Sequence, residues 1–165
     1  MDYLAFAETP LGPVTLASDG EALIGLWFQG QAHENAGLAT ETERRELPVF
    51  RETRRWLALY FAGERPDFPL PLAPRGSDFQ RRVWDSLRRI PYGSVVSYGA
   101  LARELGCASP RAVGQAVGRN PISLLIPCHR VLGARGRPTG YAGGLWRKEA
   151  LLRLEGVLGK EDTWN

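Results

Sequence analysis

Residues 97–121 read SYGALARELGCASPRAVGQAVGRNP, and this stretch decides the fold of the second half of the chain. It contains two short segments that each begin at a serine suited to cap a helix, Ser97 and Ser109. Pro110 takes the first helical position of the second segment, and Gly106 ends the first. Two short helices joined by a tight turn are typical of a helix-turn-helix, whose second helix enters a DNA groove.

The second predicted helix is made almost entirely of small residues. Gly114 and Gly118 each cost about 1 kcal/mol relative to alanine in a helix interior. Close approach to a nucleic-acid groove would offset this cost, and so would close packing against a neighbouring helix; spacing alone favours neither. Because few long side chains remain to read base edges, any DNA contact here should follow the shape of the minor groove more than the base sequence.

Further elements surround this motif in the second half of the chain. Residues 77–90 predict a helix with an apolar face, residues 122–126 (ISLLI) resemble a buried strand, and residues 134–144 form a glycine-rich loop. Residues 145–155 predict a closing helix. The leucines expected to face inward from it are Leu145, Leu151, Leu152 and Leu154.

The first half has a different pattern. Residues 3–28 alternate short apolar runs with turn signals and predict three antiparallel strands, and from about residue 42 apolar residues recur at helical spacing. Four prolines between residues 65 and 74 mark a linker. We therefore expect an α/β (α+β) chain. Residues 1–74 would form a small sheet-plus-helix domain, and residues 75–160 a mostly helical domain resembling a winged helix-turn-helix.

Charge divides the chain in a similar way. Residues 1–70 carry a net charge of −5 and residues 71–165 a net charge of +8, although the whole chain is only +3. A basic module of this size indicates a polyanionic partner such as nucleic acid, whereas arginine spread over a solvated surface is the alternative.

Cysteine and histidine are scarce. Cys107, Cys128, His33 and His129 are too few and too widely spaced for a disulfide framework or a four-ligand metal site, so we predict no metal and no cofactor. Unpaired cysteines favour a reducing, cytoplasmic setting. The first residues, MDYLAFAETPLG, do not resemble a signal peptide, and no apolar run approaches the roughly 20 residues of a membrane span.

Cys128 lies within PCHR, residues 127–130, directly after the apolar run. A thiol becomes nucleophilic as a thiolate, so it needs a base or cation nearby, and His129 and Arg130 are the candidates. Neighbours along a strand point to opposite faces, so only a turn at Pro127 would bring both to one side. Taken alone, the motif is more typical of a small buried thiol than of a nucleophile.

A wider pattern changes that interpretation. IPCHRV follows RAVGQAVGRNPIS and precedes GYAGGLWRKEALLRLEG, and together they closely resemble the O6-alkylguanine-DNA alkyltransferases, or methylated-DNA–protein-cysteine methyltransferases. The likeness runs from about Asp78 to Gly156, whereas the first half matches only in size and coarse pattern.

The resemblance implies a function and a partner. A single-function, bacterial-type member would move a methyl or other alkyl group from O6-alkylguanine, and also from O4-methylthymine, in double-stranded DNA to its own cysteine, once per molecule. It would act as a monomer on nucleoid DNA, with no cofactor, no membrane and no obligatory protein partner.

The same resemblance implies roles for individual residues. Cys128 would accept the alkyl group, His129 would act as its base through a water, and Glu155 would orient that histidine. Tyr98 would help to rotate the target phosphate and would protonate the leaving guanine, and Asn120 would brace the turn that holds the cysteine.

DNA and pocket contacts are implied as well. Arg111 would fill the gap left by the flipped nucleotide, and Lys148 would support the site from the closing helix. The remaining residues of the implied binding set are Arg119, Ser97, Tyr141, Ala142 and, through its backbone, Val131.

Two departures and three alternatives accompany this prediction. Ala142 stands where some relatives have a serine and Ser123 where others have a proline, which puts alkyl groups larger than methyl in doubt. The zinc-binding regulatory domain of adaptive-response members is not expected.

A non-reactive lesion binder would carry another residue in place of Cys128, a winged-helix regulator leaves PCHRV without a role, and a thiol hydrolase needs turnover and an oxyanion hole.

Overall fold

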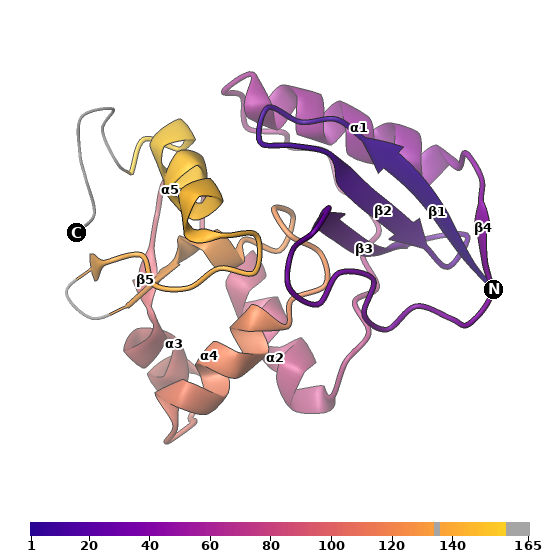
Figure 1. Cartoon of the computed structure of the whole chain (residues 1–165). Helices are drawn as coiled ribbons and strands as arrows, with labels where there is room; N and C mark the ends of the chain where they lie inside the picture. The colour runs from indigo at the N-terminus through magenta and orange to yellow at the C-terminus, as the bar shows by residue number, and fades with distance from the viewer. Residues whose placement is uncertain (134–135, 158–165) are drawn as a thin grey trace. The chain divides into compact units, whose positions relative to one another are not determined.

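A computed structural model describes residues 1–133 and 136–157 (Figure 1). Within these ranges the chain divides into two compact units. The first comprises Met1–Arg75 together with Pro121–Ser123, and the second begins at Gly76 and resumes at Leu124. Residues 158–160, the end of the second predicted domain, lie outside the described residues.

A four-stranded sheet forms the first unit. The strands are β1 (Asp2–Ala7), β2 (Val14–Ser18), β3 (Leu23–Phe28) and β4 (Thr42–Arg44), in the order β3-β2-β1-β4. β1, β2 and β3 pair antiparallel, which confirms the three predicted strands, and β4 pairs in parallel with β1. The sequence did not predict β4, because a three-residue, largely exposed strand has no apolar alternation to mark it.

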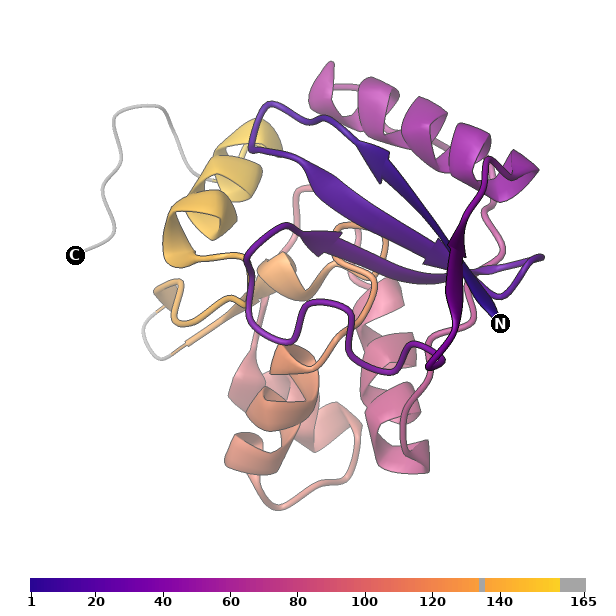
Figure 2. The same ribbon diagram turned by 45° about the vertical axis from the view of Figure 1, so that its right-hand side comes forward.

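Helix α1 (Pro48–Phe61) lies along one face of this sheet in both views (Figures 1 and 2). It begins six residues later than the expected residue 42, with Pro48 in its first turn. Every residue of β2 and β3 is buried. A Cβ atom on Gly25 would lie only 2.0 Å from the ring of Trp27, so this position requires glycine if the tryptophan is to pack across the strand.

The predicted strand at residues 122–126 is wrong. Only Ile122 forms a bridge, in parallel with Leu26, and the following residues make a turn. Leu124 in that turn has a φ of 73°, a left-handed conformation that costs a non-glycine residue about 1 to 2 kcal/mol. The segment is apolar because the turn is buried, and an apolar run by itself does not separate a buried turn from a buried strand.

Three helices come first in the second unit. They are α2 (Asp78–Arg88), α3 (Tyr98–Glu104) and α4 (Pro110–Gly118), and α4 packs against both others. The predicted helix-turn-helix is confirmed in α3 and α4. Their caps are confirmed too: Ser97 Oγ accepts from the Ala100 amide at 3.0 Å and Ser109 Oγ from the Ala112 amide at 3.1 Å.

The rest of the second unit carries the cysteine. The 3-10 helix η1 (Cys128–Arg130) continues into β6 (Val131–Leu132), which pairs in parallel with β5 (Val96–Ser97). Helix α5 (Leu145–Leu154) closes the unit, with Leu151 and Leu152 fully buried. Leu154 is half-buried, and the inward prediction for Leu145 is wrong, because this first residue of α5 is 42% exposed.

Candidate active site

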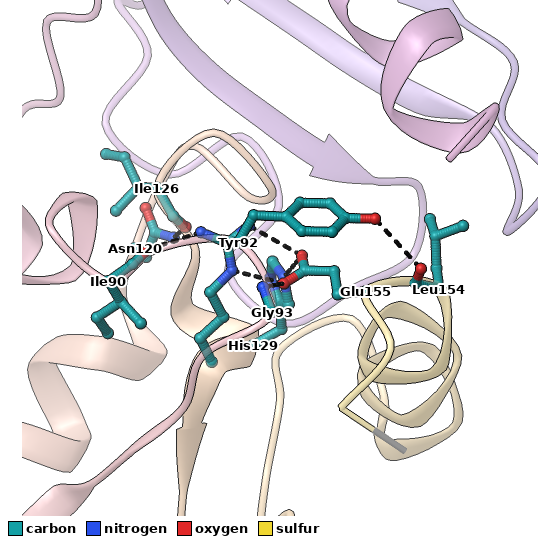
Figure 3. Close-up of polar contacts among 9 residues, drawn as sticks. Ile90, Tyr92, Gly93, Asn120, Ile126, His129, Leu154 and Glu155 are labelled. Carbon is teal, nitrogen blue, oxygen red and sulfur yellow. Dashed lines mark hydrogen bonds and ion pairs between the residues drawn. The ribbon is translucent and has the colours of Figure 1, made fainter. Parts of the chain in front are cut away.

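The turn that carries Cys128 follows Pro127 directly. Consecutive side chains of a 3-10 helix are rotated by about 120°, so neighbouring residues of η1 do not point to opposite faces as they would in a strand. This is the turn that the sequence required if Cys128 and His129 were to serve one site. Asn120 donates from Nδ2 to the carbonyl of Ile126 at 2.8 Å, the contact that a brace for the turn would make (Figure 3).

His129 is fully buried and bonded to Glu155 (Figure 3). Its Nε2 lies 2.7 Å from Oε2 of that carboxylate. An ionised carboxylate only accepts hydrogen bonds, so the proton of neutral His129 resides on Nε2 and the lone pair on Nδ1. Nδ1 has no hydrogen-bond partner among the described residues, the Cys128 thiol included. The imidazole therefore presents a buried, unpartnered base nitrogen.

The electrostatic setting of this pair is set by burial and by neighbouring charge. Burial lowers the pKa of His129, although Glu155 acts in the opposite direction, so the imidazole is neutral near pH 7. Burial also favours the neutral acid at Glu155, but hydrogen bonds from His129 and Arg130 outweigh it and hold its pKa well below the usual range. The base is thus neutral and its partner is ionised.

Cys128 is a buried residue, 6% exposed. Burial raises the pKa of Cys128, whereas a hydrogen bond from Asn120 and the positive charge of Lys148 favour the thiolate. Arg130, which the sequence offered as a cation for the thiol, pairs with Glu155 instead. The cation that acts on the sulfur therefore comes from α5 and not from the PCHR motif.

Lys148 and Tyr98 meet at the glycine-rich loop. Lys148 Nζ donates to the carbonyls of Gly140 at 3.1 Å and Thr139 at 3.4 Å, and the Tyr98 hydroxyl donates to the same Thr139 carbonyl at 3.4 Å. The ammonium also lies 5.9 Å from the centre of the Tyr98 ring. Burial lowers the pKa of Lys148 to about 8. For Tyr98, burial raises the pKa and the charge of the Cys128 thiolate raises it further, so the phenol stays protonated at neutral pH.

An open cleft of about 580 Å³ begins beside Tyr98. Its lining residues are Tyr98, Pro110, Arg111, Gly114, Gln115, Thr139 and Gly140. A Cβ on Gly114 would come within 3.7 Å of the Tyr98 ring, and one on Gly118 would meet nothing within 4 Å. Close helix packing therefore does not explain Gly118. A second cavity of about 340 Å³, between β1 and α1, has no cysteine or histidine in its lining.

The structure brings some of the predicted residues together and leaves others at the periphery. The side chains of Cys128, His129, Glu155, Asn120, Tyr98 and Lys148 form one connected group, and Arg111 lines the cleft with Tyr98. Arg119 is exposed at the end of α4, and Ser97 caps α3. Val131 is buried in β6, and Tyr141 and Ala142 are half-buried in the loop before α5.

Sequence reasoning missed two features of this site. Thr139 and Gly140 enter through their backbone carbonyls, which no side-chain motif can indicate. Arg130 was considered only as a neighbour of the thiol, although the basic residue next to His129 and the acid at the end of the closing helix were a signal for an ion pair. Within the described ranges, no cluster of three or more His, Cys, Asp or Glu side chains could hold a metal ion.

Comparisons with known proteins place this geometry in context. The family model described as 6-O-methylguanine DNA methyltransferase, DNA binding domain, matches residues 78–157. The model for the ribonuclease-like domain of the same proteins matches residues 3–74. A relative named methylated-DNA--protein-cysteine methyltransferase, from Methanosarcina acetivorans, is 46% identical over 155 residues, which is 93% of this chain and 98% of the relative. A Mycobacterium tuberculosis protein of the same name is 46% identical over 90% of this chain and 88% of its own.

Solved structures give the same result. The crystal structure of Mycobacterium tuberculosis OGT in complex with DNA superposes with a TM-score of 0.84 at 44% identity, and covers 93% of this chain and 92% of its own. An O6-methylguanine DNA methyltransferase from Methanococcus jannaschii superposes with a TM-score of 0.65 at 26% identity over 98% of both chains.

Proposed function

The chain belongs to the 6-O-methylguanine DNA methyltransferase family, and from that premise we propose that it repairs DNA by moving the alkyl group of O6-alkylguanine onto its own Cys128. The observation that carries the assignment is the buried thiol on a turn shared with His129, whose Nδ1 has no hydrogen-bond partner among the described residues while Nε2 is bonded to Glu155. Methylated guanine is the expected substrate, and O4-methylthymine a further one.

The reaction is an in-line displacement at carbon. A water links the thiol to His129 Nδ1 and carries the thiol proton to the imidazole, while Sγ of Cys128 forms a bond to the methyl carbon. The bond between that carbon and O6 breaks, and its electron pair stays with guanine. Guanine accepts a proton from the Tyr98 hydroxyl, and the proton held by His129 returns to the phenolate. The net products are S-methylcysteine and unmodified guanine.

The charges of the site stabilise the thiolate on one side and keep the proton donor protonated on the other. Lys148 and Asn120 stabilise the thiolate, which would otherwise be disfavoured by burial. Tyr98 stays protonated until the bond between the methyl carbon and O6 breaks, because burial and the nearby thiolate both raise its pKa. Glu155 is ionised and stabilises the imidazolium that forms for an instant.

The product of the reaction is a thioether on Cys128. Water does not readily hydrolyse a carbon–sulfur bond of this kind, unlike the thioester of a cysteine hydrolase, so each molecule reacts once. The substrate must leave the base stack to reach the thiol of the buried Cys128, which costs a few kcal/mol. Arg111, on the helix that lines the cleft, would occupy the vacated position in the duplex and offset part of that cost. Arg119 and Ser97 would contact the phosphate backbone, and Tyr141, Ala142 and Val131 the flipped base.

The two halves of the chain have separate roles in this proposal. Residues 75–160 bind DNA and carry the thiol, and residues 1–74 form a supporting domain. Every helix in the described part of the chain falls short of the length and apolarity needed to cross a membrane. We place the protein in the cytoplasm, acting as a monomer on nucleoid DNA, without a metal or organic cofactor.

Mass spectrometry tests the function directly. Wild-type protein is incubated with a duplex oligonucleotide containing one O6-methylguanine, and intact and peptide masses are recorded. The expected result is one methyl group per protein, mapping to Cys128, with no turnover afterwards. Cys128→Ser should bind the same duplex and gain no mass, and Cys107→Ser, which changes the other cysteine, should react normally. Binding without an adduct in the wild type would instead identify a non-reactive lesion binder.

A further inference from the structure

Arg130 binds both oxygens of the Glu155 carboxylate. Its Nε donates to Oε1 at 2.7 Å, and its Nη2 donates to Oε2 at 3.0 Å. A two-pronged contact of this kind fixes the plane of the carboxylate as well as its distance. The Gly93 amide donates to Oε1 at 3.2 Å, so Oε2 is the oxygen left for His129 (Figure 3).

The guanidinium is itself held in place. Nη1 of Arg130 donates to the carbonyl of Ile90 at 2.7 Å, and its carbon lies 5.7 Å from the centre of the Tyr92 ring. Tyr92 in turn donates from its hydroxyl to the Leu154 carbonyl at 3.2 Å, next to Glu155 (Figure 3). Arg130 is 9% exposed. All three guanidinium nitrogens of Arg130 donate hydrogen bonds, so this buried side chain cannot exchange freely between partners. The carboxylate that it binds, Glu155, is therefore held in one orientation.

We propose that Arg130 is a positioning residue for the base: it orients Glu155 toward His129 Nε2, and its charge keeps His129 in the neutral form that can accept the thiol proton at Nδ1. This inference rests on the proposed alkyl transfer to Cys128. It assigns a function to the residue of the PCHR motif that the reaction scheme leaves unused, and it acts through Glu155 and His129 without touching substrate.

The sign of the charge effect follows from the groups that face His129. Glu155, the residue that follows α5, favours the imidazolium, whereas Arg130 on η1 and Lys148 on α5 disfavour it, in addition to burial. Without Arg130, the full charge of Glu155 would act on His129 alone, and the pKa of the imidazole would rise. A protonated His129 accepts no proton, so alkyl transfer would then need a higher pH.

The alternative is that Arg130 only stabilises the fold by pairing with a buried acid. Both roles predict that its loss lowers thermal stability. They differ in the pH dependence of the reaction, because a purely structural ion pair would change the amount of folded protein and leave the pH profile of the folded fraction unaltered.

Two substitutions separate charge from orientation. Arg130→Gln removes the charge, and Arg130→Lys keeps the charge but loses the planar fork. Arg89→Gln is the matched control, because Arg89 pairs with Glu104 at 3.1 Å on the exposed surface of the same unit. Single-turnover rate constants for methyl transfer from an O6-methylguanine duplex are measured from about pH 5 to about pH 9, corrected for folded fraction, and His129 is titrated by NMR in the same proteins.

Arg130→Gln should move the acid limb of the rate profile, and the NMR midpoint of His129, to higher pH. Arg130→Lys should leave the limb near that of the wild type and lower the rate about tenfold through lost orientation. Arg89→Gln should match the wild type in both. The inference is overturned if Arg130→Gln shifts neither the acid limb of the rate profile nor the NMR midpoint of His129. A wild-type rate in Arg130→Lys overturns it as well, and this second result is decisive if Arg130→Gln does not fold. Absence of any adduct in the wild type would refute the proposed function, while the NMR titration would still test the effect of Arg130 on His129.

Discussion

Replacing Glu155 with glutamine probes the centre of the site. The carboxylate accepts four hydrogen bonds, from His129, from two nitrogens of Arg130 and from the Gly93 amide. Glutamine keeps the shape of the side chain but removes its charge, and it places an NH2 group against donors. The Arg130 guanidinium, 9% exposed, then loses its counter-charge.

The cost follows from that unpaired charge. Breaking a buried ion pair on one side typically costs about 3 to 5 kcal/mol, and we expect the lower value because Arg130 retains the Ile90 carbonyl and the Tyr92 ring. For a chain of this length, 1 kcal/mol corresponds to about 2 to 4 °C in Tm. Glu155→Gln should therefore unfold about 6 to 12 °C below the wild type at pH 7, measured by circular dichroism.

Acid pH provides an internal check. The pKa of Glu155 is lower in the folded protein than in the unfolded chain, so its contribution to stability is complete above the unfolded value of about 4.3 and is lost as the pH falls below it. The difference in Tm between Glu155→Gln and the wild type should thus shrink below about pH 4. Glu104→Gln, at an exposed ion pair, should cost at most about 1 kcal/mol. A Glu155→Gln protein as stable as the wild type at pH 7, or a difference that persists undiminished in acid, would refute the reasoning.

Three more outcomes are expected. Arg111→Ala should slow repair of duplex DNA by about tenfold or more while barely changing transfer from a single-stranded oligonucleotide, because only the duplex needs a residue in the vacated position; equal losses on both would contradict that role. Tyr98→Phe should lower the transfer rate about a hundredfold, a far larger change than in DNA affinity, measured by single-turnover kinetics and fluorescence anisotropy; an unchanged rate would remove Tyr98 as the proton donor. Burial lowers the pKa of His129 below its unfolded value of about 6.5, so the wild type should lose stability as the pH falls below about 6.5. Denaturant titrations should show that His129→Gln lacks this pH-dependent loss of stability, whereas His33→Gln, changed at an exposed position, keeps it.

Local signals in the sequence were accurate where neighbouring residues alone set the structure. Ser77 forms a capping box with Gln80, and Ser97 and Ser109 cap the helices that their positions predict. The same reasoning failed at Leu124 and Leu145. Whether an apolar residue is buried in a strand, buried in a turn or left exposed at a helix end depends on contacts distant in sequence, and hydrophobic periodicity does not record them.

The candidate site divides in the same way. The sequence by itself determined which residue types are present: one thiol beside a histidine, an acid at the end of the closing helix, and the motif that identified the family. Only the tertiary structure decided how they are paired. Glu155 lies 26 positions from His129 in the chain, and the 3-10 turn at η1 allows both His129 and Arg130 to reach it, which adjacent residues on a strand would not. The fold thereby leaves Nδ1 of His129 as the base nitrogen and makes Lys148 the cation that favours the Cys128 thiolate. Because these groups are buried, their protonation depends on the few partners within hydrogen-bond or Coulomb range.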